Sequence, residues 1–407
     1  MIMKSFRRVA VVLAAFVFTS QNTSAQTTPS IDDVLNEINT ITTAVPLMMI
    51  SPEARAGGMG DQGVASEPDA NSIHWNSSKL AFIEKKSGFS VSYTPWLRAL
   101  VNDMFIGYVS GYSRLKNGQA IGGSLRYFSL GNITFTDANG QFIRDFKPNE
   151  FALDMAYSRK LSEYFSGGIA LRFIHSNLTG GTTVEGADSK AGNSVAADVN
   201  GYFTKEVEVG NKDAVFTSGF NISNIGSKMS YTETGTKNFI PTNLRLGSGL
   251  KLNLNEFNSL GFMFDLNKLL VPTPPVYVQD STNSATSQIL YGRDPNVSVA
   301  QGMLQSFSDA PGGATEEFRE LNVGFGMEYW YDRQFAFRGG YFWEHETKGN
   351  RKYFTLGAGL RYNVFGLDLA YLIPTDQRNP LENTLHFTLT FDFDGVGSGQ
   401  NRENTTD

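Results

Sequence analysis

The hydrophobic residues of this chain alternate with a period of two from Gly88 almost to the C-terminus. This period is typical of β-strands whose two faces meet different environments. There are fourteen such runs, and all but the first have 11 to 13 residues. Strands of soluble proteins usually have about 5 or 6 residues, whereas a tilted strand that crosses an outer membrane needs about 9 to 11. The pattern therefore predicts membrane-crossing strands at 88–95, 103–115, 119–129, 150–160, 164–176, 194–204, 214–225, 242–254, 258–269, 320–331, 334–345, 351–361, 364–374 and 383–394.

The connections between these runs alternate in length. The odd-numbered connections have 7, 20, 17, 16, 50, 5 and 8 residues, and the even-numbered ones have 3, 3, 9, 3, 2 and 2. In an outer-membrane barrel, short turns face the periplasm and longer loops face the exterior. The first short connection also contains Asn117-Gly118, a dipeptide that tight hairpins prefer. The sequence thus predicts an all-β membrane protein, a 14-stranded antiparallel outer-membrane β-barrel over 88–394 with both termini periplasmic. The predicted short turn at 205–213 is unusually long, with nine residues.

The ends of the chain carry their own signals. Basic residues precede an apolar stretch at 9–18, and small residues at 23–25 precede Gln26, a pattern typical of a secretory signal peptide over residues 1–25. The apolar stretch is too short to span a bilayer, which needs about 20 residues. We expect residues 395–407 to form a flexible periplasmic tail.

Composition excludes several classes of function. The chain has no cysteine, which rules out a disulfide scaffold, a Cys-ligated metal site and a thiol nucleophile. A net charge of −6 gives no reason to expect nucleic acid. We therefore expect no nucleic-acid partner, no metal and no cofactor.

Assigning the apolar column of each strand to lipid places twelve charged residues in the lumen-facing column. A lipid-facing Arg or Lys near the bilayer midplane costs about 2–4 kcal/mol, so their absence from the apolar column supports the assignment. We interpret the twelve as a structural salt-bridge mesh, with catalytic or conducting roles as the less favoured alternative. They are Asp154, Asp198, Asp265, Glu328, Asp368 and Asp392, with Arg126, Arg172, Arg245, Lys251, Arg338 and Arg361.

The lumen-facing column is also rich in glycine. Glycine at these positions either relieves strand curvature or leaves room for a plug inside the lumen. Residues 26–87 are too polar to join the barrel wall, and we expect them to form an N-terminal helix and a hatch in the lumen. Within them, Ser30 and Asp33 are spaced as a capping box, and the pattern from Ser30 to Ile41 predicts a short amphipathic helix.

The predicted hatch contains a recognisable motif, in a run from Ser51 to Ala65 and a second run from Asp69 to Asn76. These runs resemble the hatch of the FadL-like fourteen-stranded barrels and, more closely, that of the PorV family of the Bacteroidota type IX secretion system. The resemblance covers nearly the whole mature chain, and it departs at Ser77-Ser78, where FadL-like proteins usually carry Pro-Ala. The motif residues are Arg55, Gly57, Gly58, Met59, Gly60, Trp75 and Asn76.

The resemblance implies a non-enzymatic function in protein secretion. PorV-like proteins bind the C-terminal signal domain of secreted cargo as it leaves a SprA/Sov-like translocon barrel. They carry the cargo to a PorU-like sortase and attachment complex at the cell surface, which removes the signal and attaches the cargo to lipopolysaccharide. The implied partners are therefore the translocon barrel, the attachment complex, the signal domains of cargo, and outer-membrane lipid and lipopolysaccharide.

The long connection at 270–319 is the first place to look for a cargo-binding surface, because loops of this length are usually functional or disordered. An exposed apolar helix there would suit docking, whereas a lid packed on the barrel mouth is an equal alternative. Its apolar elements are the extended segment Val276-Tyr277-Val278 and a helix, begun near Asn296 or Ser298, that aligns Val299, Met303, Leu304 and Phe307.

The first long loop is also unusually apolar for an exterior loop, at Trp96, Leu97 and Leu100. These residues are candidates for contact with a partner barrel or cargo. Anchoring at the membrane boundary, where Trp is enriched, is at least as favoured.

Two other functions remain open. A FadL-like passive transporter of hydrophobic compounds would need a continuous apolar path, whereas the predicted lumen is charged and lined by glycine. A surface hydrolase or metal site would use His175, His345 and His386 near the extracellular strand ends, but their spacing matches no ligand motif. Acidic Glu316-Glu317 is most simply a solvated loop end, with pairing to a basic cargo surface as the alternative.

Overall fold

The structure is a computed structural model that describes residues 30–98, 100–136, 139–181, 183–184, 187–232, 235–278, 288–376 and 379–394. The predicted signal peptide at 1–25 and the predicted tail at 395–407 lie outside the described residues. Within the described ranges, no helix has the length and apolar character needed to cross a membrane.

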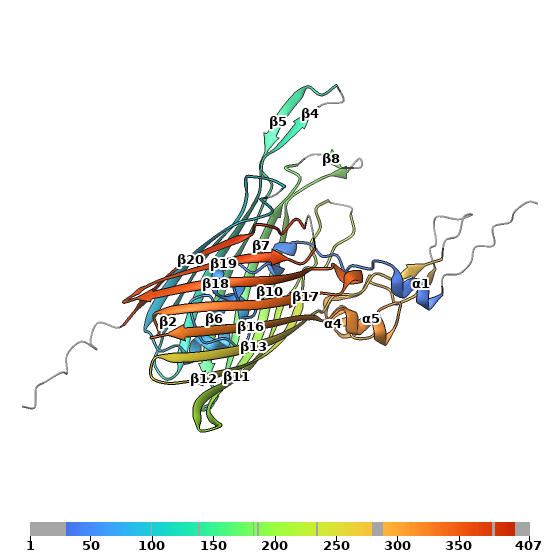
Figure 1. The fold of residues 1–407 in the computed structure, drawn as a ribbon. Helices are drawn as coiled ribbons and strands as arrows, with labels where there is room; N and C mark the ends of the chain where they lie inside the picture. Colours follow the sequence, from blue (N-terminus) through green and yellow to red (C-terminus); the bar gives the residue numbers. More distant parts are fainter. Residues whose placement is uncertain are drawn as a thin grey trace, which may run out of the picture.

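Fourteen strands close into one antiparallel barrel (Figure 1), which confirms the predicted fold class. The barrel closes where β1 pairs with β20. Every strand boundary lies within two residues of its prediction except the end of β10. The strands are β1 (Ser87–Pro95), β2 (Met104–Arg114), β3 (Gln119–Leu130), β6 (Asn149–Lys160), β7 (Phe165–Asn177), β10 (Gly192–Val209), β11 (Lys212–Gly226), β12 (Asn243–Asn253), β13 (Asn258–Leu269), β16 (Asn322–Tyr331), β17 (Phe335–Trp343), β18 (Lys352–Tyr362), β19 (Phe365–Pro374) and β20 (Leu385–Phe393).

The prediction of a nine-residue turn at 205–213 is wrong. Strands β10 and β11 continue to a two-residue turn at Gly210 and Asn211, whose φ angles of 55° and 65° are those of a tight hairpin. Charged residues such as Lys205 and Glu206 ended the predicted run early. They belong to a hairpin that projects past the rim of the barrel (Figure 1), where charged side chains do not meet lipid.

Side chains alternate between lipid and lumen as the hydrophobic period predicts. In β6, Met155 is 72% exposed on the outer wall, while its neighbours Asp154 and Ala156 are buried inside. The same alternation holds in β13, β19 and β20. The apolar columns therefore form the lipid-facing surface.

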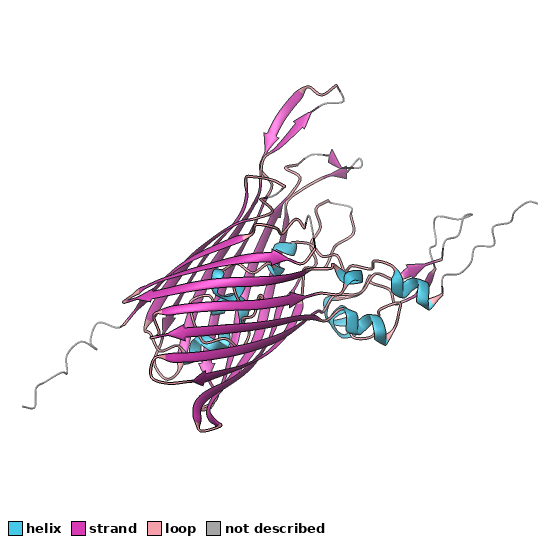
Figure 2. Ribbon diagram, in the orientation of Figure 1, coloured by secondary structure: helices cyan, strands magenta, loops and turns pink. Residues whose placement is uncertain are grey.

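Residues 44–83 fill the lumen with short helices, visible inside the barrel in Figure 2. Two of these helices are capped at their N-termini by side chains. Glu53 accepts hydrogen bonds from the Arg55 and Ala56 amides, and Asn76 accepts one from the Ser78 amide. These caps satisfy helix-end N–H groups that would otherwise be buried without partners. The helices are η1 (Pro46–Met49), α2 (Ala54–Gly57), α3 (Ser72–Trp75) and η2 (Ser77–Phe82).

Helix α1 (Ile31–Asn36) lies outside the barrel, beside the long loop (Figure 1). The predicted capping box of Ser30 and Asp33 is present, but the helix ends at Asn36 rather than Ile41. Arg319 of the long loop donates to the Leu35 carbonyl. The N-terminal helix is therefore separate from the plug that fills the lumen.

The remaining elements lie at the long-loop end of the barrel. Figure 1 shows α1, α4 and α5 on one side of the barrel mouth and the β4–β5 hairpin on the other. These elements are the helices α4 (Val299–Gln305), α5 (Ala314–Arg319) and η3 (Glu346–Lys348), and the hairpins β4 (Ile133–Thr136) with β5 (Phe142–Phe146), β8 (Thr183–Val184) with β9 (Ala187–Asp188), and β14 (Val276–Tyr277) with β15 (Ile289–Tyr291).

Candidate functional site

Arg55 of the hatch motif joins the plug to the barrel wall. Its guanidinium donates to both Glu328 carboxylate oxygens, at 3.0 and 2.9 Å, and to Asp69 of the hatch at 3.1 Å. Glu328 also accepts from Arg338 at 2.8 Å, and Arg338 donates to Asp368 at 2.8 Å. Because Arg55, Glu328, Arg338 and Asp368 are buried, each charge needs these partners to offset its desolvation.

The twelve lumen charges do not form one continuous mesh. Arg172 with Asp154 and Asp198 makes one ion-pair cluster, and Arg338 with Glu328, Asp368 and Arg361 makes another. The other charges bind elsewhere: Asp265 accepts from the hatch amides of Gly63 and Val64, Lys251 pairs with Glu67 of the hatch, and Asp392 accepts from Tyr112. Much of the lumen charge thus serves to hold the hatch.

Arg126 and Arg245 have no carboxylate partner among the described residues. Arg126 donates to the Leu47 carbonyl at 3.2 Å and contacts the His74 ring. Arg245 lies over the Trp75 ring, with 5.1 Å from its guanidinium carbon to the ring centroid. Both side chains therefore also contact the plug.

The glycine-rich column of the wall is where the hatch backbone packs. A Cβ at Gly340 would lie 2.2 Å from the Gly60 nitrogen, and a Cβ at Gly357 would lie 3.2 Å from the Gly58 Cα. At Gly324 it would overlap the Gln62 side chain. The missing side chains make room for the plug, which is the second of the two alternatives considered for these glycines.

The second half of the motif ties the hatch to the opposite wall. Asn76 donates to the carbonyls of Val64 and Gly201, at 3.1 and 3.0 Å. Ser77, at the position of the departure from the FadL-like pattern, donates to Asn200 at 3.0 Å. The turn after Trp75 is therefore held by side-chain hydrogen bonds without proline.

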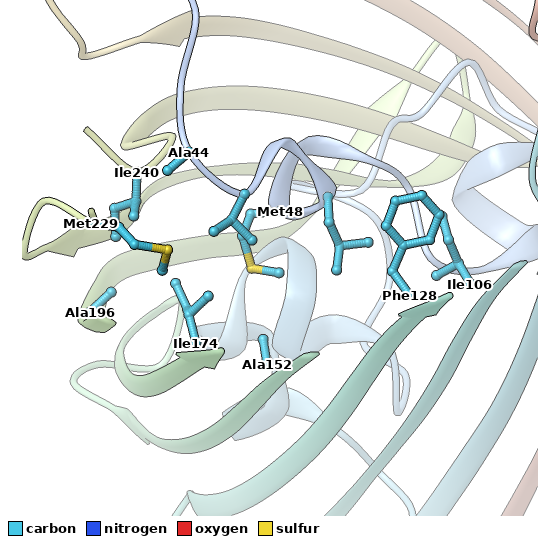
Figure 3. Packing of buried hydrophobic residues seen from close by; sticks show 11 residues of the cluster. Ala44, Met48, Ile106, Phe128, Ala152, Ile174, Ala196, Met229 and Ile240 are labelled. Atoms are coloured by element: carbon cyan, nitrogen blue, oxygen red, sulfur yellow. The ribbon is translucent and has the colours of Figure 1, made fainter. Parts of the chain in front are cut away.

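The lumen near the long loops contains an apolar cluster on the side of β2, β3, β6, β7 and β10, which the sequence analysis missed. Leu47 and Met48 of η1 are buried in a cluster with wall residues such as Ile106, Phe128 and Ile174. Figure 3 shows Ile240, Met229 and Ile174 on one side of Met48 and Phe128 and Ile106 on the other. The residues Ile106 and Ile174 occupy the inward columns of β2 and β7, so the apolar inward positions at these strand ends were the available signal.

A buried ion cluster fixes the second half of the long loop. Lys268 at the end of β13 donates to Glu317 at 2.9 Å and to Glu320 at 2.7 Å. Lys348 of η3 pairs with Glu316 and Glu320. Our interpretation of Glu316-Glu317 as a solvated loop end is therefore wrong, because these carboxylates pair with Lys268 of β13 and Lys348 of η3.

The apolar candidates of the long loop divide between exposed and packed positions. Leu304 and Phe307 are 77% and 52% exposed, and Tyr277 and Val278 are also exposed. Val299 and Met303 of α4 and Val276 of β14 are half-buried. Gly302 of α4 packs on Phe239 and Pro272. One face of α4 therefore contacts the barrel mouth, and the face that carries Leu304 is exposed to solvent.

In the first long loop, Leu100 is exposed, whereas Trp96 and Leu97 are half-buried. Trp96 packs against the apolar cluster of the lumen mouth.

The β4–β5 hairpin was not predicted, although it carries large exposed apolar residues. Phe142 and Ile143 are 64% and 58% exposed. On its other face, Arg144 lies over the rings of Phe135 and Phe146. The alternation of Ile133 and Phe135 with Thr134 and Thr136 was a readable strand signal within the second long connection.

The histidines do not form a site. His386 is buried beside Thr94, His345 begins η3, and His175 stacks on Phe151. Within the ranges that the structure describes, no group of three or more His, Asp or Glu side chains is placed to hold a metal ion.

The family model described as "Type IX secretion system protein PorV" matches residues 33–276. No curated protein matches the sequence. Among solved structures, the toluene transporter TbuX of Ralstonia pickettii is similar with a TM-score of 0.47 and 10% identity, covering 85% of this chain and 98% of that chain. The toluene transporter TodX of Pseudomonas putida has a TM-score of 0.47 and 10% identity, with 88% and 100% covered. A Pseudomonas aeruginosa FadL homologue has a TM-score of 0.42 and 12% identity, with 88% and 99% covered.

Proposed function

Because the chain belongs to the PorV family of type IX secretion system proteins, we propose that it binds the C-terminal signal domain of cargo and shuttles the cargo between two partners. The first partner is a SprA/Sov-like translocon barrel, from which the cargo emerges. The second is a PorU-like sortase complex, which removes the signal domain and attaches the cargo to lipopolysaccharide. In this arrangement the long loops face the cell exterior, and the short turns and both termini face the periplasm.

The observation that carries this proposal is the filled lumen. Leu47 and Met48 occupy the half of the lumen near the long loops. Deeper in the barrel, Arg55 binds Glu328, and the hatch backbone lies directly on Gly340 and Gly357. A filled barrel suits a protein that acts through its outer surface, because such a function needs no passage through the wall.

The long loop offers a suitable surface for a protein partner. Leu304 and Phe307 are exposed at α4, and Phe318 of α5 is 71% exposed. The ion pairs of Lys268 and Lys348 hold the end of this loop against the barrel. Exposed apolar side chains on a fixed support favour binding, since little conformational entropy is lost when a partner docks.

The test is complementation of a deletion strain with the wild type or with Leu304→Ser combined with Phe307→Ser. We expect the double variant to accumulate cargo with uncleaved signal domains, and to lose those domains from affinity purifications. Phe257→Ser is the matched control, because Phe257 is 53% exposed but lies in the short turn between β12 and β13. Normal cleavage in the deletion strain itself would contradict the proposed function.

The apolar cluster of Figure 3 favours a second candidate, a FadL-like passive transporter of hydrophobic compounds. In the described residues its space is taken by Leu47 and Met48 of the chain itself. A transporter would require these side chains to leave. Loss of growth on a hydrophobic nutrient in the deletion strain, with secretion intact, would support this second function.

A further inference from the structure

The lipid-facing wall has a hollow of about 610 Å³ over β2, β3 and β6. In one row across the wall, Gly111 of β2 pairs with Gly123 of β3, and neither carries a side chain toward the lipid. The row continues to Phe89 on one side and to Met155 on the other. Two adjacent bare positions between bulky neighbours make a groove about 10 Å wide, because neighbouring strands lie about 4.8 Å apart.

The lining of this hollow is apolar on the outward side. Ile121, Met155, Ile169 and Leu171 line it, and all four are exposed on the outer wall. Apolar walls of this kind accept hydrocarbon without unsatisfied polar groups. The hollow is therefore suited to an acyl chain.

A polar rim follows the hollow toward the short turns. In the next row Tyr157 lies beside Ile121, and its hydroxyl donates to Gln119 at 2.9 Å. In the row after that, Gln119 pairs with Arg159. Arg159 continues the outward column of β6 beyond Met155 and Tyr157 and is exposed. The column thus passes from hydrocarbon-facing to cationic along one strand.

Arg159 belongs to a basic sector at the short-turn end. Lys116 lies in the turn between β2 and β3. Lys160, the last residue of β6, does not contribute to this sector, because its ammonium lies over the Phe82 ring of the plug. Lys116 and Arg159 are exposed and have no carboxylate partner in the part of the chain that the structure describes. By contrast, the turn between β12 and β13 carries Glu256 and no basic residue. Arg159 and Lys116 therefore place positive charge at the short-turn end of the hollow.

We propose that this hollow and its basic rim bind one anionic glycerophospholipid of the periplasmic leaflet. An acyl chain lies in the groove over Gly111 and Gly123, and the phosphate lies at Arg159 and Lys116. Basic side chains next to an apolar groove favour anionic lipid, with about 1 kcal/mol for each Lys or Arg near the surface. The site is separate from the cargo-binding loops, since it lies on the outer wall toward the opposite end of the barrel.

The test uses purified barrel in nanodiscs of phosphatidylcholine and phosphatidylglycerol, with native mass spectrometry of the lipid retained on release. We expect the wild type to retain phosphatidylglycerol in preference to phosphatidylcholine. Arg159→Gln should lower retention of phosphatidylglycerol about fivefold and leave phosphatidylcholine unchanged. The matched control is Arg333→Gln, in the turn between β16 and β17.

Filling the groove tests the acyl-chain part of the site. Gly123→Leu should lower retention of both lipids about fivefold or more, since its Cβ meets nothing closer than 3.4 Å and the side chain enters the hollow. Gly111→Leu, whose Cβ also meets only contacts of 3.4 Å or longer, is an independent second variant. Gly339→Leu is the control, on the outer face of β17 with no contact under 3.9 Å.

Two results would overturn the proposal: equal retention of the two lipids by the wild type, or no difference between the groove variants and their control. A partner protein that copurifies with the wild type and is lost with Gly123→Leu would also overturn it, because the hollow would then be a protein interface.

Discussion

Two adjacent glycines of β17 provide a matched test of the docked hatch. Gly340 faces the lumen, and a Cβ there would lie 2.2 Å from the Gly60 nitrogen and the Met59 carbonyl carbon. Gly339 faces outward, and a Cβ there would lie 3.9 Å from its nearest contact, the Thr355 carbonyl oxygen. Alanine at the two positions should therefore have opposite effects.

The magnitude follows from these distances. An ordinary contact begins at 3.4 Å, so Gly340→Ala requires the hatch backbone to retreat by about 1.2 Å, the difference between 3.4 and 2.2 Å. Overpacking of a well-packed interior costs about 1–3 kcal/mol, and we expect the upper end because backbone cannot rotate away as a side chain can. Gly339→Ala should stabilise the strand by about 0.5–1 kcal/mol, because alanine loses less conformational entropy than glycine on folding.

Cysteine labelling measures this difference directly. The chain has no cysteine of its own, so a single Ala70→Cys places one thiol in the hatch, at a position that is 1% exposed. A cost of about 3 kcal/mol to hatch docking raises the open population about 100-fold. Labelling by a maleimide should therefore be about 100-fold faster in Gly340→Ala and no faster in Gly339→Ala. Equal rates in the two variants would refute the packing of the hatch on this wall.

Two further predictions concern the charged residues. Arg55→Leu leaves Glu328 without its hatch partner and should cost about 3–5 kcal/mol, whereas Lys251→Leu removes a half-exposed ion pair and should cost less than about 1 kcal/mol. The temperature at which the folded band disappears on gels checks the order; equal temperatures would contradict it. In the long loop, burial and the nearby Glu317 carboxylate raise the pKa of Asp309 from 3.8 to about 6. A raised carboxyl pKa means that the folded loop binds the proton more tightly than the unfolded loop, so loop stability falls as pH rises from about 4 to about 6. The rate at which a protease cleaves the loop should therefore be about tenfold lower at pH 5 than at pH 7.5. Asp309→Asn should abolish that difference, and a difference that persists in this variant would exclude Asp309 as its cause.

The barrel itself could be predicted because the alternation that produces it lies within each strand and can be read from neighbouring residues. Alternation at two residues sets which face of each strand meets lipid, and a shift of one residue would expose charges such as Asp154 to the hydrocarbon. The strand ends were harder to place where the environment changes. Lys205 and Glu206 ended the predicted β10 early, since a charged residue beyond the membrane and a charged residue in a turn look alike in sequence.

The contacts of the hatch could not be predicted to the same degree, because they join residues far apart in the chain. The sequence showed that Glu328 and Asp265 face inward, but it could not show that Arg55 and the Gly63 amide meet them there. The ion pairs of the long-loop carboxylates could not be predicted for the same reason. Glu316 has an unremarkable sequence environment, and its partner Lys348 lies beyond the next two strands.

The account depends most on a barrel that crosses the outer membrane with its long loops outside. Single cysteines at two exposed positions test this in intact cells: Ser308→Cys in the long loop and Lys116→Cys in the first short turn. With a membrane-impermeant maleimide, we predict labelling of Ser308→Cys in intact cells and of Lys116→Cys only after the outer membrane is permeabilised. Labelling of Lys116→Cys in intact cells while Ser308→Cys stays protected would contradict the account.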